Sequence, residues 1–206
     1  MDTQDGGMVM PVSNLTEFFR DALDEALAHQ KVALDAHSAH YVVNLLTLFS
    51  RVEHSHAELK PGCRWISLAD LLAQAQSAQT PAEQAAALQR LGDVARFMAG
   101  FCAHGFARRL VDVDYPIAMG GRAYGMLAGQ LTRGPRRALG EVFAELARKF
   151  QPVVDALGEI ADSARSWSQN DVLRLYEIWL KTGSRRAHAV LRQLGVQPHA
   201  VPLHTH

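Results

Sequence analysis

The sequence predicts an all-α protein, a single-domain bundle of about seven or eight helices. Apolar residues recur at spacings of three and four along almost the whole chain, and the two-residue alternation of strands is nearly absent. Residues that commonly start helices precede several of these apolar runs. No internal repeat of fixed period is present, which disfavours a solenoid. The length of 206 residues suits one domain with a sizeable core.

The expected domain spans residues 13–195. We expect residues 1–12 to be a flexible N-terminus and residues 196–206 to be a loose tail, because the tail contains two prolines and lacks apolar periodicity. These boundaries leave nearly the whole chain available for the helical bundle.

Four helices are predicted in the first half of the domain. Asn14 and Glu17 have the spacing of a capping box, which predicts a helix from there to about His29. An apolar stripe over residues 42–52 marks the second helix, and Ser67 begins a short third one. Residues 80–83, Thr-Pro-Ala-Glu, predict the start of a fourth helix that continues towards residue 110 unless one of its glycines interrupts it.

The second half predicts four more helices. Pro116 disfavours helical geometry at Tyr115, so a helix should begin after it and end before residues 133–135. The longest apolar stripe covers residues 139–160, and Pro152 inside it predicts a kink or break near Gln151. Residues 168–171 open the next helix, residues 182–184 separate it from a last one, and Gly195 is the expected stop.

Gly121, Gly125 and Gly129 form a stripe at a strict spacing of four on one of these helices. Each glycine in a helix interior costs about 1 kcal/mol relative to alanine, so the stripe calls for a compensating interaction. Two interpretations remain open: another helix packs closely against the stripe, or a flat ligand such as a porphyrin or a base lies on it.

Composition and charge narrow the classes of function. The chain has 21 basic and 21 acidic residues, so no net field attracts nucleic acid or an anionic membrane. Residues 1–35 are acidic and residues 181–192 are basic; these segments can pair within the fold, pair between copies, or remain solvated. The two cysteines, the N-terminus without a signal pattern and the lack of a long apolar run together predict a cytoplasmic protein with no membrane partner.

A polar site is predicted around residues 91–126, because charges embedded among apolar and glycine residues need partners. The candidate ligand-binding residues are Asp93, Arg109, Asp112, Asp114, Tyr115, Gly121, Arg122, Tyr124 and Gly125. Asp112 and Asp114 have a spacing that can bind Mg²⁺ when phosphates complete the shell, although helix capping and pairing with nearby arginines also explain them. No catalytic residue is assigned.

No cofactor is predicted. Haem or a divalent metal remains an alternative, because a few histidines could act as ligands. His37 and His40 lie three residues apart, a spacing that can share a metal, and His104 lies among aromatic residues as an axial haem ligand would, with His29 as an alternative. The sequence lacks HExxH and zinc-finger spacings, so solvated helix surfaces account for these histidines equally simply.

The C-terminal sequence WLKTGSRRAHAVLRQLG superficially resembles a helix-turn-helix. Trp179 lies four positions before Gly183, where a helix-turn-helix usually has a small residue. One basic helix in a neutral chain is weak evidence for DNA binding. Nucleic acid is therefore an unlikely partner, and a terminal hairpin with a basic outer surface is expected.

The run LGDVARFMAGFCAHGFARRLVDVDYPIAMGGRAYGML, residues 91–127, resembles an uncharacterised family of bacterial all-helical cytosolic proteins. The segments YVVNLLTLFSR and LRLYEIWLKTGSRR are similar to other parts of that family, so the resemblance covers residues 15–195. It implies an all-helical bacterial cytosolic protein and no activity.

These observations lead to the expectation of a non-enzymatic helical binding or interaction protein that self-associates or binds a protein partner. The alternatives are a haem- or metal-binding helical enzyme or sensor, and a DNA-binding regulator that uses the C-terminal hairpin.

Overall fold

A computed structural model describes residues 12–55, 67–101, 114–132, 135–162 and 169–197, and every regular element in these ranges is an α-helix. The fold is all-α, as predicted, with nine helices in the described ranges instead of seven or eight. The additional helix arises because the long apolar stripe divides into α6 (Arg137–Arg148) and α7 (Phe150–Asp162).

The other helices follow the predicted order. Their bounds are α1 Val12–His29, α2 Ala36–Ser55, α3 Leu68–Ser77, α4 Pro81–Phe101, α5 Asp114–Leu131, α8 Gln169–Thr182 and α9 Arg185–Gln193. None of the described helices is long and apolar enough to cross a bilayer.

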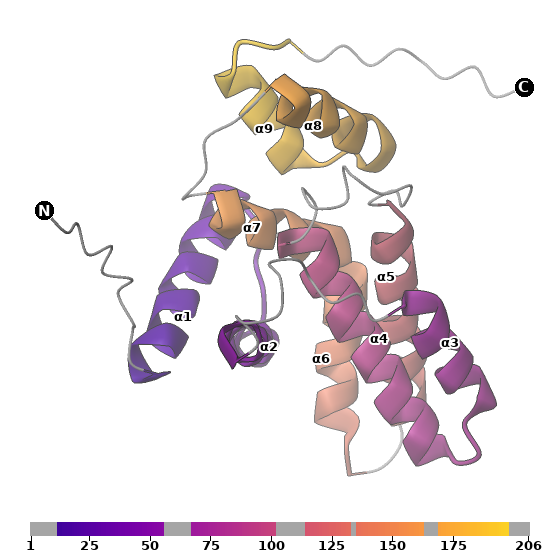
Figure 1. Cartoon of the computed structure of the whole chain (residues 1–206). Coiled ribbons are helices and arrows are strands. Elements are labelled where there is room, and N and C mark those ends of the chain that lie inside the picture. The colour runs from indigo at the N-terminus through magenta and orange to yellow at the C-terminus, as the bar shows by residue number, and fades with distance from the viewer. Residues whose placement is uncertain (1–11, 56–66, 102–113, 133–134, 163–168, 198–206) are drawn as a thin grey trace, which may run out of the picture.

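The helices pack around α4. Figure 1 shows α3, α4, α5 and α6 running side by side, with α2 seen end-on and therefore crossing them steeply. α1 packs on α2 and α7 on the other side, and α7 also contacts α4. The hairpin of α8 and α9 covers one end of the bundle, where α9 contacts α7.

Several helix ends carry the hydrogen bonds that the sequence predicts. The Glu83 N–H donates to Thr80 Oγ1 at 3.2 Å and the Thr80 N–H donates to Glu83 Oε2 at 3.2 Å, which is a reciprocal capping box. The Ser67 hydroxyl accepts from the N–H of Asp70. Gly195 has φ 80° just beyond α9, so the predicted stop is confirmed.

Two other expectations about helix ends are wrong, and a third is close. Asn14 lies inside α1, which begins at Val12. Tyr115 is helical despite Pro116, because α5 begins at Asp114 and a proline in the first turn lacks only an N–H that has no partner within the helix. The break predicted near Gln151 is present; it lies at Lys149, so that Pro152 falls in the first turn of α7.

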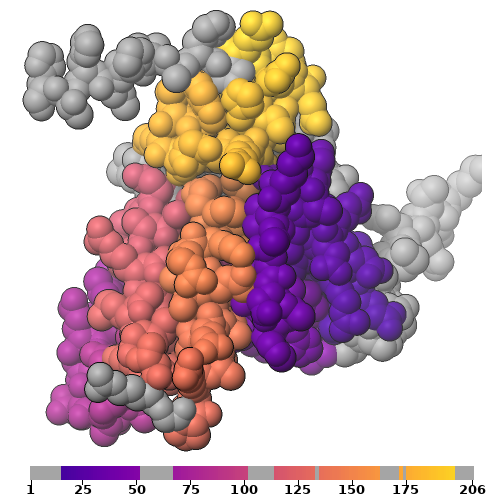
Figure 2. Space-filling model, turned by 180° about the vertical axis from the view of Figure 1, so that it is seen from behind, coloured from indigo at the N-terminus to yellow at the C-terminus, as the bar shows by residue number. Residues whose placement is uncertain are grey.

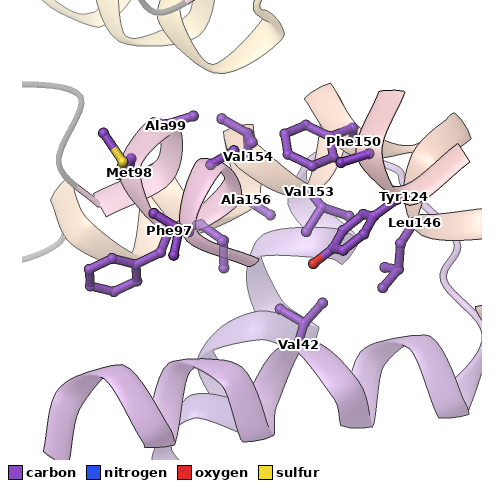
Figure 3. Close-up of a cluster of buried hydrophobic side chains, with 14 of the residues drawn as sticks. Val42, Phe97, Met98, Ala99, Tyr124, Leu146, Phe150, Val153, Val154 and Ala156 are labelled. Carbon is purple, nitrogen blue, oxygen red and sulfur yellow. The ribbon is translucent and has the colours of Figure 1, made fainter. Parts of the chain in front are cut away.

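The core is densest where α4 passes through the bundle. From Leu91 to Gly100 every residue is buried except the half-buried Asp93, as expected for a helix surrounded by others. Figure 3 shows this core, in which Tyr124 of α5 reaches between Leu146 and Val153 with its hydroxyl directed toward α2 and Val42. Phe97 stacks on Phe49 of α2 at a centroid distance of 4.3 Å.

Candidate functional site

A polar network lies inside this apolar core. Asp93 Oδ1 accepts hydrogen bonds from the hydroxyls of Tyr41 and Tyr124, at 2.7 and 2.5 Å, and Gln89 donates its amide N–H to the Tyr41 hydroxyl at 3.0 Å. These residues, together with Arg96, are called the Asp93 network below. They come from α2, α4 and α5, so one carboxylate connects three helices.

Arg96 is the most deeply buried charge of the network, with 0% of its surface exposed. Its Nη2 donates to the carbonyl oxygen of Leu146 in α6 at 2.9 Å. The guanidinium carbon lies 4.6 Å from the ring centroid of Phe150 and 4.9 Å from that of Tyr124. Nε and Nη1 have no hydrogen-bond partner among the described residues, so cation–π attraction to the two rings is their principal contact.

Two glycines make room for those rings. A Cβ on Gly92 of α4 would lie 2.3 Å from Cε1 of Tyr124, and a Cβ on Gly120 of α5 would lie 2.2 Å from Cζ of Phe150. Any other residue at either position would push a ring away from Arg96. The aromatic contacts of the arginine therefore depend on the absence of these two side chains.

Burial controls the protonation of the network. Desolvation raises the pKa of Asp93, although hydrogen bonds from Tyr124 and Tyr41 and the nearby Arg96 charge oppose the rise. Desolvation also raises the pKa of both tyrosines, which therefore stay protonated as donors to the carboxylate. Burial lowers the pKa of Arg96, and the neighbouring Tyr124 and Asp93 oppose this effect.

The geometry suits the Asp93 network to holding helices together more than to meeting a substrate. Arg96 and Tyr124 have no exposed surface, and only the half-buried edge formed by Gln89, Tyr41 and Asp93 approaches the surface. A buried polar group with its partners in place favours one relative arrangement of the helices that supply them. Here those helices are α2, α4, α5, α6 and α7.

The structure separates the predicted site residues into two groups. Asp93 and Tyr124 belong to the Asp93 network. The side chains of Asp114, Tyr115 and Arg122 are exposed on α5, as is Gly125, and Gly121 is half-buried there. Arg109 and Asp112 lie outside the described residues.

The exposed residues form a surface of their own on α5. We call it the α5 outer face: Tyr115, Ala118, Arg122, Gly125, Met126 and Gly129, all exposed. A Cβ on Gly125 or Gly129 would meet no atom of the described residues within 4 Å, and Met126 keeps 54% of its surface exposed. Figure 2 shows α5 at the surface beside α6 and α7, below the α8–α9 hairpin.

Gly125 and Gly129 therefore do not pack closely against another helix within the described residues. A Cβ on Gly121 would make only ordinary contacts with Phe150, the nearest at 3.7 Å. The glycines that do permit close approach are others, among them Gly92, Gly100 and Gly120. A helix that packs on Gly125 and Gly129 must therefore come from outside the described residues.

The candidate metal and haem ligands occupy ordinary surroundings where they are described. His37 and His40 are exposed on α2, and the Asn44 amide hydrogen-bonds His40 Nε2 at 3.0 Å. His29 is also exposed and lies 2.6 Å from a carboxylate oxygen of Glu159. His104 is outside the described ranges, within which no group of three or more His, Cys, Asp or Glu side chains is placed to hold a metal.

A second polar network fixes the hairpin to α7. Asp155 Oδ1 accepts from the Ser184 hydroxyl at 2.7 Å and from the Gln151 amide at 2.9 Å. Arg186 of α9 forms a buried ion pair with Asp162 through Nε and Nη2. Arg186 is therefore buried, and of the three arginines of α9 only Arg185 and Arg192 are exposed. A DNA duplex bound by the hairpin would contact only these two.

Sequence reasoning missed Tyr41 and Arg96. Arg96 carried a usable signal, because it lies three residues after Asp93 in an otherwise apolar run, where two charges on neighbouring turns need partners. Tyr41 carried none, because its contact with Asp93 joins residues 52 positions apart.

Comparison of the chain with protein-family models, with curated proteins and with solved structures found no match. No activity, cofactor or site residue is therefore carried over to this chain from another protein.

Proposed function

We propose that this chain is a non-enzymatic interaction protein that packs the α5 outer face against the same face of a second copy. The main support for this proposal is the open space at Gly125 and Gly129, because neither glycine allows a close contact within the described fold. Each weakens the helix by about 1 kcal/mol relative to alanine. A helix arriving from another molecule would compensate for that cost, since small residues at a spacing of four let two helix backbones approach closely.

The rest of the α5 outer face supports a contact between identical surfaces. Met126 and Tyr115 expose apolar area next to the glycines on the same helix. Methionine adapts its shape to a facing surface, and aromatic residues are enriched at interfaces. A twofold contact requires one patch to complement itself, and a nearly flat stripe of glycines beside apolar side chains can do so.

The same proposal places the protein in the bacterial cytoplasm. Its support is the resemblance of residues 91–127 together with the sparse cysteines of the sequence.

The test compares native masses of the wild type and of Gly125→Leu with Gly129→Leu. The wild type should be a concentration-dependent dimer in about 1 M salt, where charge–charge contacts are screened. The double variant should dissociate at least about tenfold more readily while unfolding no more easily, because leucine is the better helix former at exposed positions.

A matched control is Ala69→Leu with Ala73→Leu, which places two leucines at the same spacing on an exposed side of α3. This control should dimerise as the wild type does. A wild type that stays monomeric at about 100 μM, well above the micromolar range of ordinary association, would overturn the proposal. So would a double variant that dimerises normally.

A further inference from the structure

The α8–α9 hairpin exposes apolar side chains on α8 and basic side chains on α9. Leu173 and Leu180 lie seven residues apart on the side of α8 opposite the buried Leu175 and Ile178, and Leu173 keeps 68% of its surface exposed. On α9, Arg185 and Arg192 repeat at the same interval and are both exposed. Neither arginine side chain has an ion-pair or hydrogen-bond partner in the described ranges.

The opposite combination lies on α1. Its inner side buries Phe19, Leu23, Ala26 and Leu27 against the bundle. Its outer side exposes Glu17, Asp21, Asp24 and Glu25, and Phe18, which is 46% exposed, lies at one edge of this acidic surface. Arg20 is the one basic residue exposed among them, and no ion pair joins Glu17, Asp21 or Asp24 to a described residue.

From this complementarity we infer that the outer side of the α8–α9 hairpin binds the outer side of α1 from a second copy of the chain. The two arginines would face the α1 carboxylates, and Phe18 would cover part of the exposed leucine surface. Opposite charges steer such an encounter and fix its register, and the apolar contact of Phe18 with the leucines adds affinity. Within one copy the two surfaces do not satisfy each other, since no ion pair connects α1 with α9 in the described chain.

The contact differs in symmetry from the one proposed for α5. It joins two different surfaces, so each copy keeps one free hairpin and one free α1 after pairing. Head-to-tail contacts of this kind continue into rings or open chains. The inference goes beyond the proposed function and does not require the α5 contact.

Ionic strength separates the two contacts. Exposed charge pairs act over about 30 Å at 10 mM salt and about 3 Å at 1 M, whereas apolar packing persists at high salt. Analytical ultracentrifugation of the wild type should therefore show species larger than a dimer at about 10 mM salt and their loss at about 1 M. The Gly125→Leu, Gly129→Leu variant removes only the proposed α5 contact. It should therefore still associate in a salt-sensitive way through α1 and the hairpin.

Charge reversal provides the decisive test. Arg185→Glu with Arg192→Glu should abolish the low-salt species, and so should Asp21→Lys with Asp24→Lys. Each variant keeps one native surface, so an equal mixture of the two should associate again, which unfolding of either variant would not allow. Wild-type protein whose mass is independent of salt would overturn the inference, as would variants that associate normally or a mixture that stays apart.

Discussion

At the scale of single residues, Arg96 shows how the interior holds a charge without a direct carboxylate partner. One hydrogen bond to a backbone carbonyl and two aromatic rings surround it. Asp93 lies one turn away on the same helix and is satisfied by two phenols instead. Charge compensation is thus spread over three side chains, Tyr41, Tyr124 and Phe150, and one backbone carbonyl, and loss of any one leaves a buried charge with fewer partners.

The raised pKa of Asp93 predicts how stability depends on pH. The folded protein binds this proton more tightly than the unfolded chain does, because burial penalises the carboxylate. The stability that this group contributes is therefore complete below the ordinary carboxyl pKa and is lost as the pH rises through the raised folded pKa.

Asp93→Asn keeps an acceptor oxygen but cannot titrate. The unfolding free energy of the wild type relative to this variant should decline as the pH rises above about 4, measured by urea denaturation. Asp155→Asn serves as a control, because burial raises the pKa of Asp155 too and the two contributions must be separated. Parallel pH curves for wild type and Asp93→Asn would contradict the assignment.

At the scale of an element, the inner side of α5 has no space for a side chain at its glycine, whereas the outer side has open space at its glycines. Gly120 faces inward against Phe150 and Ala95, whereas Gly125 and Gly129 face outward into open space. The outward stripe can be recognised from the sequence because its glycines recur at a regular spacing of four. The inward glycine has no such pattern, because the ring that requires it comes from another helix.

The adjacent Gly120 and Gly121 give a matched comparison. Gly120→Ala should destabilise the fold by about 1–3 kcal/mol, because its Cβ would overlap Phe150 and displace the ring from Arg96. Gly121→Ala should be neutral or stabilising by up to about 1 kcal/mol, since its Cβ would meet only ordinary contacts. Thermal and chemical denaturation of both variants would test this, and equal effects would show that ring packing does not decide the outcome.

At the scale of the whole molecule, the hairpin depends on few connections to the bundle. α8 packs mainly on α9, and α9 reaches α7 through Ser184, Arg186 and the residues around them. A unit attached in this way is expected to open before the core formed by α4 to α7.

Ser184→Ala should make this opening easier. It removes the hydrogen bond to Asp155 and the N-cap bond to the N–H of Ala187, which together contribute about 1–3 kcal/mol. Amide hydrogen exchange should accelerate in residues 169–193 and remain unchanged in α4. Ser77→Ala, at an exposed helix end, is the control and should leave exchange in both regions as it is. Uniform acceleration over the whole chain would argue against an independent hairpin.

The sequence by itself determined the fold class, the order of the helices and several of their ends. Those features follow from local causes: apolar periodicity, the capping box at Thr80 and Glu83, and the glycine after α9. The break between α6 and α7 lies within two residues of the predicted position, whereas α5 begins before Pro116 because a proline is compatible with the first turn of a helix.

Only the tertiary structure decided which polar residues meet and which surfaces stay open. Asp93 was recognisable as a charge in an apolar run, but its partners Tyr41 and Tyr124 lie 52 and 31 positions away. The orientation of the glycine stripe was likewise undetermined, since spacing places residues on one side of a helix without saying what that side faces. Contacts between distant segments depend on how whole helices pack, and that packing is a property of the folded chain.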